Sequence, residues 1–186
     1  WRVYYNSDGK DMSDCDLRGA HLSGRTFEGA NLAGANLAGA NIGEATFEGA
    51  NLSGANLRRA RLTHITLTGA NLSGATLVGV STGGLGAYLK YANLTNANLT
   101  NADLRSANLT GANLKGATLI VTKLTNAYLT NADLSNADLS SANLTYANLT
   151  NANLSDVILE GVQSDNISGL PLSLPDGWSL VDGTLV

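Results

Sequence analysis

Residues 30–34 read Ala30-Asn31-Leu32-Ala33-Gly34, and this five-residue unit repeats along most of the 186-residue chain. A large apolar residue, usually Leu, occupies every fifth position from Leu17 to Leu77 and again from Leu89 to Leu159. A small residue, usually Ala, precedes it by two positions. An α-helix repeats every 3.6 residues or so and a strand about every two, so neither keeps this pattern on one face. The pattern therefore predicts a repeating coil of short segments.

A longer stretch of identical sequence indicates the length of one coil. The sequence of residues 26–32, Thr26-Phe27-Glu28-Gly29-Ala30-Asn31-Leu32, recurs unchanged in residues 46–52. The offset of 20 residues equals four units, so we expect four units per coil. Phe47 should then stack on Phe27. Amide side chains at the same offset should form columns along the rod: Asn31, Asn51 and Asn71 in one, Asn36 and Asn56 in another.

Each position of the unit has a predicted role. The repeated apolar residue and the small residue before it should point inward and fill a narrow core. Gly or Asn two positions after the apolar residue, as at Gly69 and Asn126, suits the positive φ of a tight turn at a corner. Two residues are large or polar for the small inward position, Ile65 and Thr122, and we expect the wall to bulge there.

These features resemble the pentapeptide-repeat family, whose consensus is A(D/N)LXX. The resemblance covers roughly residues 15–161, and units such as Ala97-Asn98-Leu99-Thr100-Asn101 resemble members abundant in cyanobacteria. It implies an all-β fold, a right-handed quadrilateral parallel β-helix (a solenoid) with four repeats per coil. The 28 repeat centres give about seven coils, hence a rod roughly 34 Å long at the usual strand spacing.

Three segments are expected: an N-terminal cap over residues 1–14, the β-helix over residues 15–161, and a C-terminal capping tail over residues 162–186. A stack of repeats needs covered ends, because an exposed end is an open sheet edge. In the tail, Trp178 with Leu180 and Val181 should cover the last coil.

An irregular bulge is expected near residues 80–88. The repeat spacing from Leu77 to Leu89 is 12 residues where regular units would give 10. A degenerate repeat over residues 80–84 followed by two extra residues, Leu85 and Gly86, accounts for it. The bulge is either a glycine-rich joint between two regular halves or a loop that contacts a partner.

The chain carries no signature of catalysis, so we expect no enzyme, catalytic residue, cofactor or metal site. Cys15 is the single cysteine and is expected to be a buried structural thiol. His21 and His64 lie about two coils apart, which argues against a shared metal. A core filled by Leu and Ala leaves no pocket for a small-molecule substrate.

The candidate partner-contact residues combine a basic cluster with the bulge. Three arginines within four positions form the only basic cluster, which is too short for a nucleic-acid groove. The cluster is either a solvated surface or a site for an anion or a partner. The candidate set is Arg58, Arg59, Arg61, Leu85, Gly86 and Tyr88.

The family resemblance also implies an alternative, a DNA-mimic inhibitor or protector of a type II topoisomerase. Such members have an acidic surface and dimerise through a C-terminal helix. Here residues 1–78 hold seven acids and seven bases, residues 89–161 five and four, and the tail three acids. B-form DNA carries about one charge per 1.7 Å of axis. The near-neutral repeats and the absence of a helical pattern in the tail disfavour mimicry.

The sequence therefore predicts a non-catalytic rigid scaffold or protein-interaction module with an unknown protein partner and no nucleic-acid ligand. No stretch of 18 or more apolar residues predicts a membrane span. The chain opens at Trp1 and is expected to be either a processed product or a domain of a longer protein. A soluble domain of the bacterial cytoplasm, the periplasm or the thylakoid lumen is compatible with these features.

Overall fold

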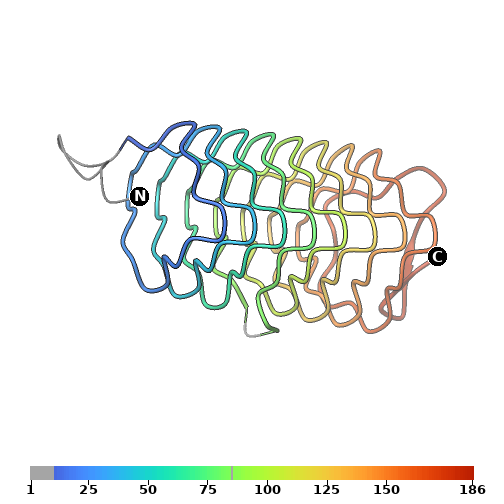
Figure 1. The fold of residues 1–186 in the computed structure, drawn as a ribbon. Helices are drawn as coiled ribbons and strands as arrows, with labels where there is room; N and C mark the ends of the chain where they lie inside the picture. The colour runs from blue at the N-terminus through green and yellow to red at the C-terminus, as the bar shows by residue number, and fades with distance from the viewer. Residues whose placement is uncertain (1–10, 85) are drawn as a thin grey trace.

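The computed structural model describes residues 11–84 and 86–186, which wind as successive coils stacked along one rod (Figure 1). The first described coil lies at one end of the rod and the C-terminal segment at the other. Most of the predicted N-terminal cap, and Leu85 of the predicted bulge, lie outside the described residues. Isolated parallel bridges join residues 20 positions apart, for example Asn31 with Asn51, so the predicted coil length is confirmed. The total number of coils stays a prediction.

The bridged residues form four columns, which define four walls of the rod. Each bridged residue immediately precedes an inward apolar residue, so successive bridged residues along the chain belong to successive walls. The columns of the first to fourth walls begin at Asp11, Asp16, His21 and Thr26. Each wall contributes only one bridged residue per coil, which is why regular strands are so short here.

Two strands occur among the described residues, both near the C-terminus. They are β1 (Leu180–Val181) and β2 (Thr184–Leu185), which pair antiparallel. The backbone N–H of Ile167 donates to the carbonyl of Gly183 at 2.8 Å, and that of Leu185 donates to Ser164 Oγ at 3.1 Å. The hairpin is therefore bonded to the segment that follows the repeats.

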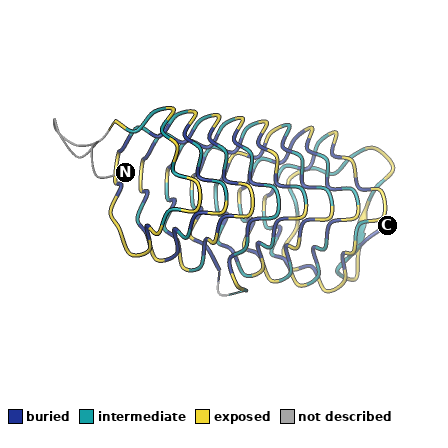
Figure 2. Cartoon of the chain, viewed as in Figure 1, coloured by how far each residue is buried: buried dark blue, intermediate teal, exposed yellow. Residues whose placement is uncertain are grey.

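The interior is a continuous column of Leu and Ala. The inward residues of the regular coils are almost fully buried (Figure 2). Burying one Leu side chain stabilises the fold by about 1.5–3 kcal/mol. Phe27 and Phe47 stack as predicted, with ring centroids 4.7 Å apart and 18° between their planes.

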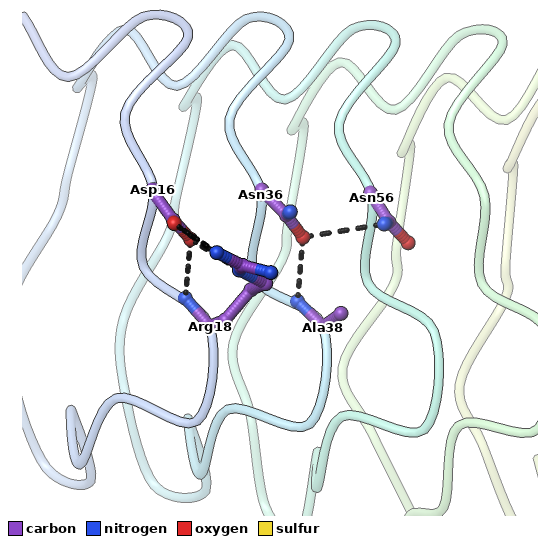
Figure 3. Close-up of polar contacts among 5 residues, drawn as sticks. All are labelled: Asp16, Arg18, Asn36, Ala38 and Asn56. Carbon is purple, nitrogen blue, oxygen red and sulfur yellow. Dashed lines mark hydrogen bonds and ion pairs between the residues drawn. The ribbon is translucent and has the colours of Figure 1, made fainter.

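Side-chain amide ladders reinforce the walls, as predicted. In the first wall, Asn51 Nδ2 donates to Asn31 Oδ1, and Asn71 Nδ2 donates to Asn51 Oδ1, both at 3.2 Å. In the second wall, Asn56 Nδ2 donates to Asn36 Oδ1 at 3.2 Å, and Asn36 Oδ1 also accepts from the backbone of Ala38 (Figure 3). Each amide thus ties its own turn to the neighbouring coil.

Corners take the left-handed backbone conformation, which explains the residues found there. Gly54 has φ +66° and Asn101 has φ +59°. Gly lacks the Cβ that makes this region costly, and the short Asn side chain tolerates it. The first half of the rod uses mainly Gly, and Asn is the most frequent corner residue of the second half, as the sequence predicted.

The bulge lies at the corner between the third and fourth walls. Ser81 belongs to the third column and Tyr88 to the fourth, so seven positions separate them where regular units use five. Bridges that span this corner join residues 22 apart, for example Thr66 with Tyr88. The predicted two-residue insertion is confirmed. Thr82 occupies the inward position of the degenerate repeat and is fully buried.

Three detailed predictions are wrong. The wall does not break at Thr122, because its hydroxyl donates to the Leu99 carbonyl at 2.8 Å while Asn143 still bonds to its carbonyl. Cys15 is only half-buried, because it lies in the first described coil, at the end of the stack. Val181 is 50% exposed.

The segment after the repeats covers the core with two of the three predicted residues and with two others. Leu185 and Ile167 are buried, and Trp178 and Leu180 are partly buried against the core. Val181 points away because alternate residues of a strand face opposite sides. At Ile65 the backbone N–H of Tyr88 donates to the Ile65 carbonyl at 2.9 Å, but the coil stacked on this residue carries the two-residue insertion between Ser81 and Tyr88, so the wall is irregular beside it.

Gly86→Ala should destabilise the rod far more than Gly54→Ala. Both glycines have positive φ, +75° and +66°, which costs about 1–2 kcal/mol for a residue with a Cβ. A Cβ on Gly86 would also lie 2.6 Å from the Ser106 carbonyl oxygen, whereas one on Gly54 meets nothing within 4 Å. Denaturant unfolding should give a loss of about 3 kcal/mol or more for Gly86→Ala. Equal losses in the two variants would contradict this packing.

The same substitution should have opposite effects at two buried threonines. The Thr82 hydroxyl is buried without a hydrogen-bond partner among the described residues, whereas the Thr122 hydroxyl is bonded. Thr82→Val removes an unpaired polar group and should stabilise by about 1 kcal/mol, while Thr122→Val should destabilise by about 1 kcal/mol. Unfolding midpoints measure both. Destabilisation by Thr82→Val would show that its hydroxyl is satisfied.

Candidate interaction surface

The arginine cluster crosses one corner of the rod. Arg58 extends from the second wall, Arg59 occupies the following corner, and Arg61 stands in the third column between Asn41 and Ser81. All three arginines are exposed. The ion pairs among the described residues join other arginines to aspartates, so none of the three has a carboxylate partner there.

Arg59 occupies a backbone position that neighbouring coils give to glycine. Its φ is +56°, and Gly39 and Gly79 hold the same corner in the adjacent coils. A Cβ placed on Gly79 would lie 3.6 Å from Arg59 Cγ, so the stem of Arg59 lies along the glycine corner. The aliphatic stem thus packs against the rod while the guanidinium extends into solvent.

An ion pair stands beside the bulge. Arg105 Nε donates to Asp103 Oδ1 at 2.8 Å, and a terminal guanidinium nitrogen donates to Oδ2 at 2.7 Å. A Cβ on Gly84 would lie 3.6 Å from the Arg105 guanidinium. The hydrogen bond from Arg105 lowers the pKa of Asp103 below its usual value, and Lys123, next in the column, contributes to the lowering.

A similar pair lies at the N-terminal end of the second wall. Arg18 donates to both carboxylate oxygens of Asp16, which lowers the pKa of Asp16 (Figure 3). Asp16 stands where Asn36 and Asn56 stand in the next coils. Asp16 and Asp103 therefore each pair with an arginine two positions further along the chain. Neither aspartate pairs with Arg58, Arg59 or Arg61.

The structure brings only part of the predicted contact set together. Arg61 is bridged to Ser81, which directly precedes Thr82 and the bulge, so Arg61 lies on the third wall beside the corner that holds the bulge. Arg58 lies one wall before and Tyr88 one wall after. The candidate residues thus spread over three consecutive walls. Gly86 is buried against Ser106 and offers little surface of its own.

Sequence reasoning selected Tyr88 but missed the other exposed tyrosines that lie around it. Tyr88 and Tyr128 stand in the fourth column, and Tyr91 and Tyr146 occupy the two corners that flank this wall. All four tyrosines are more than half exposed. The sequence did contain this information, since Tyr128 follows Tyr88 by two coils of 20 residues. The grouping is recognised only when the residues are arranged by wall.

The described residues contain no group of three or more His, Cys, Asp or Glu side chains that could hold a metal ion. Within the same part of the chain, no helix is both long and apolar enough to cross a membrane.

The stacked coils and filled core define a repeat solenoid of the β-helix class. The sequence profile of the pentapeptide repeats matches eight copies, over residues 11–49, 45–81, 86–119 and 122–161. The chain belongs to the pentapeptide-repeat family. Proteins of this family are generally non-catalytic structural or interaction proteins.

Solved structures agree with this assignment. HetL, a pentapeptide repeat protein involved in heterocyst differentiation regulation in the cyanobacterium Nostoc sp. strain PCC 7120, is 32% identical. The match covers 90% of this chain and 84% of HetL, with a TM-score of 0.53. QnrB1, a plasmid-mediated fluoroquinolone resistance protein, is 18% identical over 90% of this chain and 92% of its own, with a TM-score of 0.50. These likenesses imply a right-handed β-helix.

A pentapeptide repeat protein of the Arabidopsis thaliana thylakoid lumen is 31% identical over 65% of this chain and 69% of its own, with a TM-score of 0.31. No curated protein sequence matches this chain.

The Asp103–Arg105 pair should make stability depend weakly on pH. Because the folded pKa of Asp103 lies below its usual value of 3.8, its contribution is present at neutral pH and is lost as pH falls through the folded pKa. Asp103→Asn should therefore lower the free energy of unfolding at pH 7 by up to about 1 kcal/mol. The difference from wild type should shrink below pH 4 or so.

Urea unfolding at pH 7 and at acid pH measures this difference. Asp156→Asn, at an exposed corner outside the ion pairs of the described residues, is the matched control. A pH-independent difference for Asp103→Asn would mean that the loss arises from altered packing and not from the charge.

Proposed function

We propose that this chain is a non-catalytic rigid scaffold that binds a protein partner through the Arg58–Arg61 cluster and the neighbouring bulge. The observation that carries the proposal is three exposed arginines around one corner, with no carboxylate partner among the described residues. Arg59 moreover stands at a left-handed corner that Gly39 and Gly79 fill in the adjacent coils.

The chemistry of the cluster favours a partner surface that presents carboxylates. Guanidinium groups donate paired hydrogen bonds to carboxylates in a fixed planar geometry. The rigid wall presents these groups without first having to order a loop, which lowers the cost of association. The bulge and Tyr88 extend the contact toward the fourth wall, and Leu85 belongs to the proposed set although it lies outside the described residues.

The proposal includes the finer architecture that the sequence predicts. It comprises about seven coils of four repeats over residues 15–161, with caps formed by residues 1–14 and 162–186. The contacts of Leu185 and Ile167 with the end of the core support the C-terminal cap. No catalytic activity is proposed, because Leu and Ala fill the interior. The bacterial cytoplasm, the periplasm and the thylakoid lumen all suit such a module.

Mimicry of DNA toward a type II topoisomerase has less support. The repeats are nearly neutral, with the excess of acids confined mainly to residues 162–186. Residues 162–186 form a hairpin and turns and contain no helix, whereas the dimers expected of DNA mimics form through a C-terminal helix. The likeness to QnrB1, at 18% identity, shows the fold alone.

An affinity capture experiment tests the proposal. The baits are the wild type, a variant with Arg58→Ser, Arg59→Ser and Arg61→Ser, and a control with Arg25→Ser, Lys115→Ser and Lys123→Ser. The control removes the same charge from exposed positions elsewhere. We expect mass spectrometry to find proteins retained by the wild type and the control but lost by the cluster variant. Binding of the purified partner should weaken as salt is raised.

Other outcomes separate the alternatives. Identical sets of proteins on all three baits would contradict a role for the cluster. Capture of topoisomerase subunits by the wild type would favour mimicry. A fourth bait that lacks Leu85 and Gly86 reports whether the bulge contributes to the contact.

A further inference from the structure

The fourth wall carries an alternating column of tyrosine and asparagine. Bridges connect Tyr88, Asn108, Tyr128 and Asn148 in successive coils. Tyr88 and Tyr128 are 52% and 53% exposed. Exposed aromatic side chains offer a large, rigid contact area at low entropic cost. No other column of the rod has a tyrosine at a bridged position among the described residues.

The alternation also leaves amide donors unused. In the first wall, the asparagines from Asn31 to Asn93 bond to one another in adjacent coils, as Asn51 does to Asn31. In the fourth wall a tyrosine precedes each asparagine of the column, so this ladder does not form. Asn108 Oδ1 accepts from the backbone of Thr110, but Asn108 Nδ2 has no acceptor among the described residues. An outward amide donor therefore lies between two exposed rings.

The surroundings of this column carry almost no charge. In the four coils from Tyr88 to Asn148, the fourth wall and its corners span residues 88–91, 106–111, 126–131 and 146–151. The single charged residue there is Lys90, whose Nζ lies 5.6 Å from the ring centroid of Tyr91. The remaining outward side chains are amides, hydroxyls and tyrosines. An anionic polymer needs a row of cations, so this wall does not suit one.

The spacing of the rings suggests what the wall fits. Adjacent coils of a β-structure lie about 4.8 Å apart, so Tyr88 and Tyr128 lie about 9.6 Å apart along the rod. This is close to the length of a disaccharide unit in an extended β-linked glycan, in which every second sugar ring presents the same face. The apolar faces of sugar rings pack on aromatic rings, while their hydroxyls bond to polar side chains such as Asn108 and Thr130.

We propose that the fourth wall, from Tyr88 to Tyr128, binds a neutral, extended β-linked polysaccharide that runs along the rod axis. The two tyrosines contact alternate sugar rings, and Asn108 Nδ2 donates to a sugar hydroxyl between them. Tyr91 and Tyr146 border the same wall at its corners. This inference does not depend on the arginine cluster, which lies mainly on the second and third walls.

The probe is hydroxyethyl cellulose in native affinity gels, followed by calorimetry with cellohexaose. The wild-type chain should migrate more slowly in gels that contain the polysaccharide. Tyr88→Ala with Tyr128→Ala should weaken binding by about tenfold or more, since two ring contacts are lost. The triple Arg58, Arg59 and Arg61 serine variant should bind like the wild type, which separates this proposal from the proposed function.

A second variant tests the spacing at constant composition. Asn108→Tyr with Tyr128→Asn places the two rings in adjacent coils, about 4.8 Å apart, and should also weaken binding by about tenfold. Both positions are surface sites of the same column, so the fold should be kept, which unfolding midpoints verify.

Three results would overturn the proposal. The first is a wild-type chain that polysaccharide does not retard. The second is equal retardation of the wild type and the exchanged variant, which would indicate unspecific adhesion of aromatic side chains. The third is a dimer in sedimentation experiments that the double alanine variant abolishes, which would assign the wall to a second copy of this chain.

Discussion

The structure depends on the backbone hydrogen bonds between coils. In a regular unit the inward apolar residue donates to a carbonyl 19 positions ahead, as Leu52 does to Asn71 at 2.7 Å. The bridged residue donates to the coil behind, as Asn56 does to Ala35 at 2.9 Å. These bonds hold adjacent coils at one spacing, so that Leu stacks on Leu and Ala on Ala. Since a single unit cannot bury its own apolar face, stability arises between coils.

The same constraint determines where variation is tolerated. Inward positions accept few exceptions: Thr122 is accommodated through its bond to Leu99, whereas Thr82 remains unpaired among the described residues. Corners require a left-handed backbone and mostly hold Gly or Asn. Outward side chains are limited neither by core packing nor by a left-handed backbone, so the residues that contact ligands are expected among them. Both surfaces proposed above consist mainly of outward side chains, the arginines on one side of the rod and the tyrosines on another.

Within the family, this chain shares its fold with proteins as different as HetL and QnrB1. The fold therefore says little about the ligand, and the side chains on each wall carry the distinction. A nearly neutral surface of amides and hydroxyls separates this rod from one built to imitate a polyanion. The two-residue insertion at the bulge shifts the residue numbers of the later coils by two. The coils stay in register, because each column of bridged residues continues across the insertion.

The sequence by itself determined the period of 20 residues, the inward Leu and Ala, the Phe27–Phe47 stack and the site of the insertion. These features are local or strictly periodic, so counting residues is sufficient to predict them. The sequence also pointed to Arg58, Arg59 and Arg61, because charge clusters are visible along the chain. Only the tertiary structure decided that Leu185 and Ile167 meet the end of the core, since the tail has no period to extrapolate. Tyr88 and Tyr128 likewise became one surface only when coiling placed residues distant in the chain on the same wall.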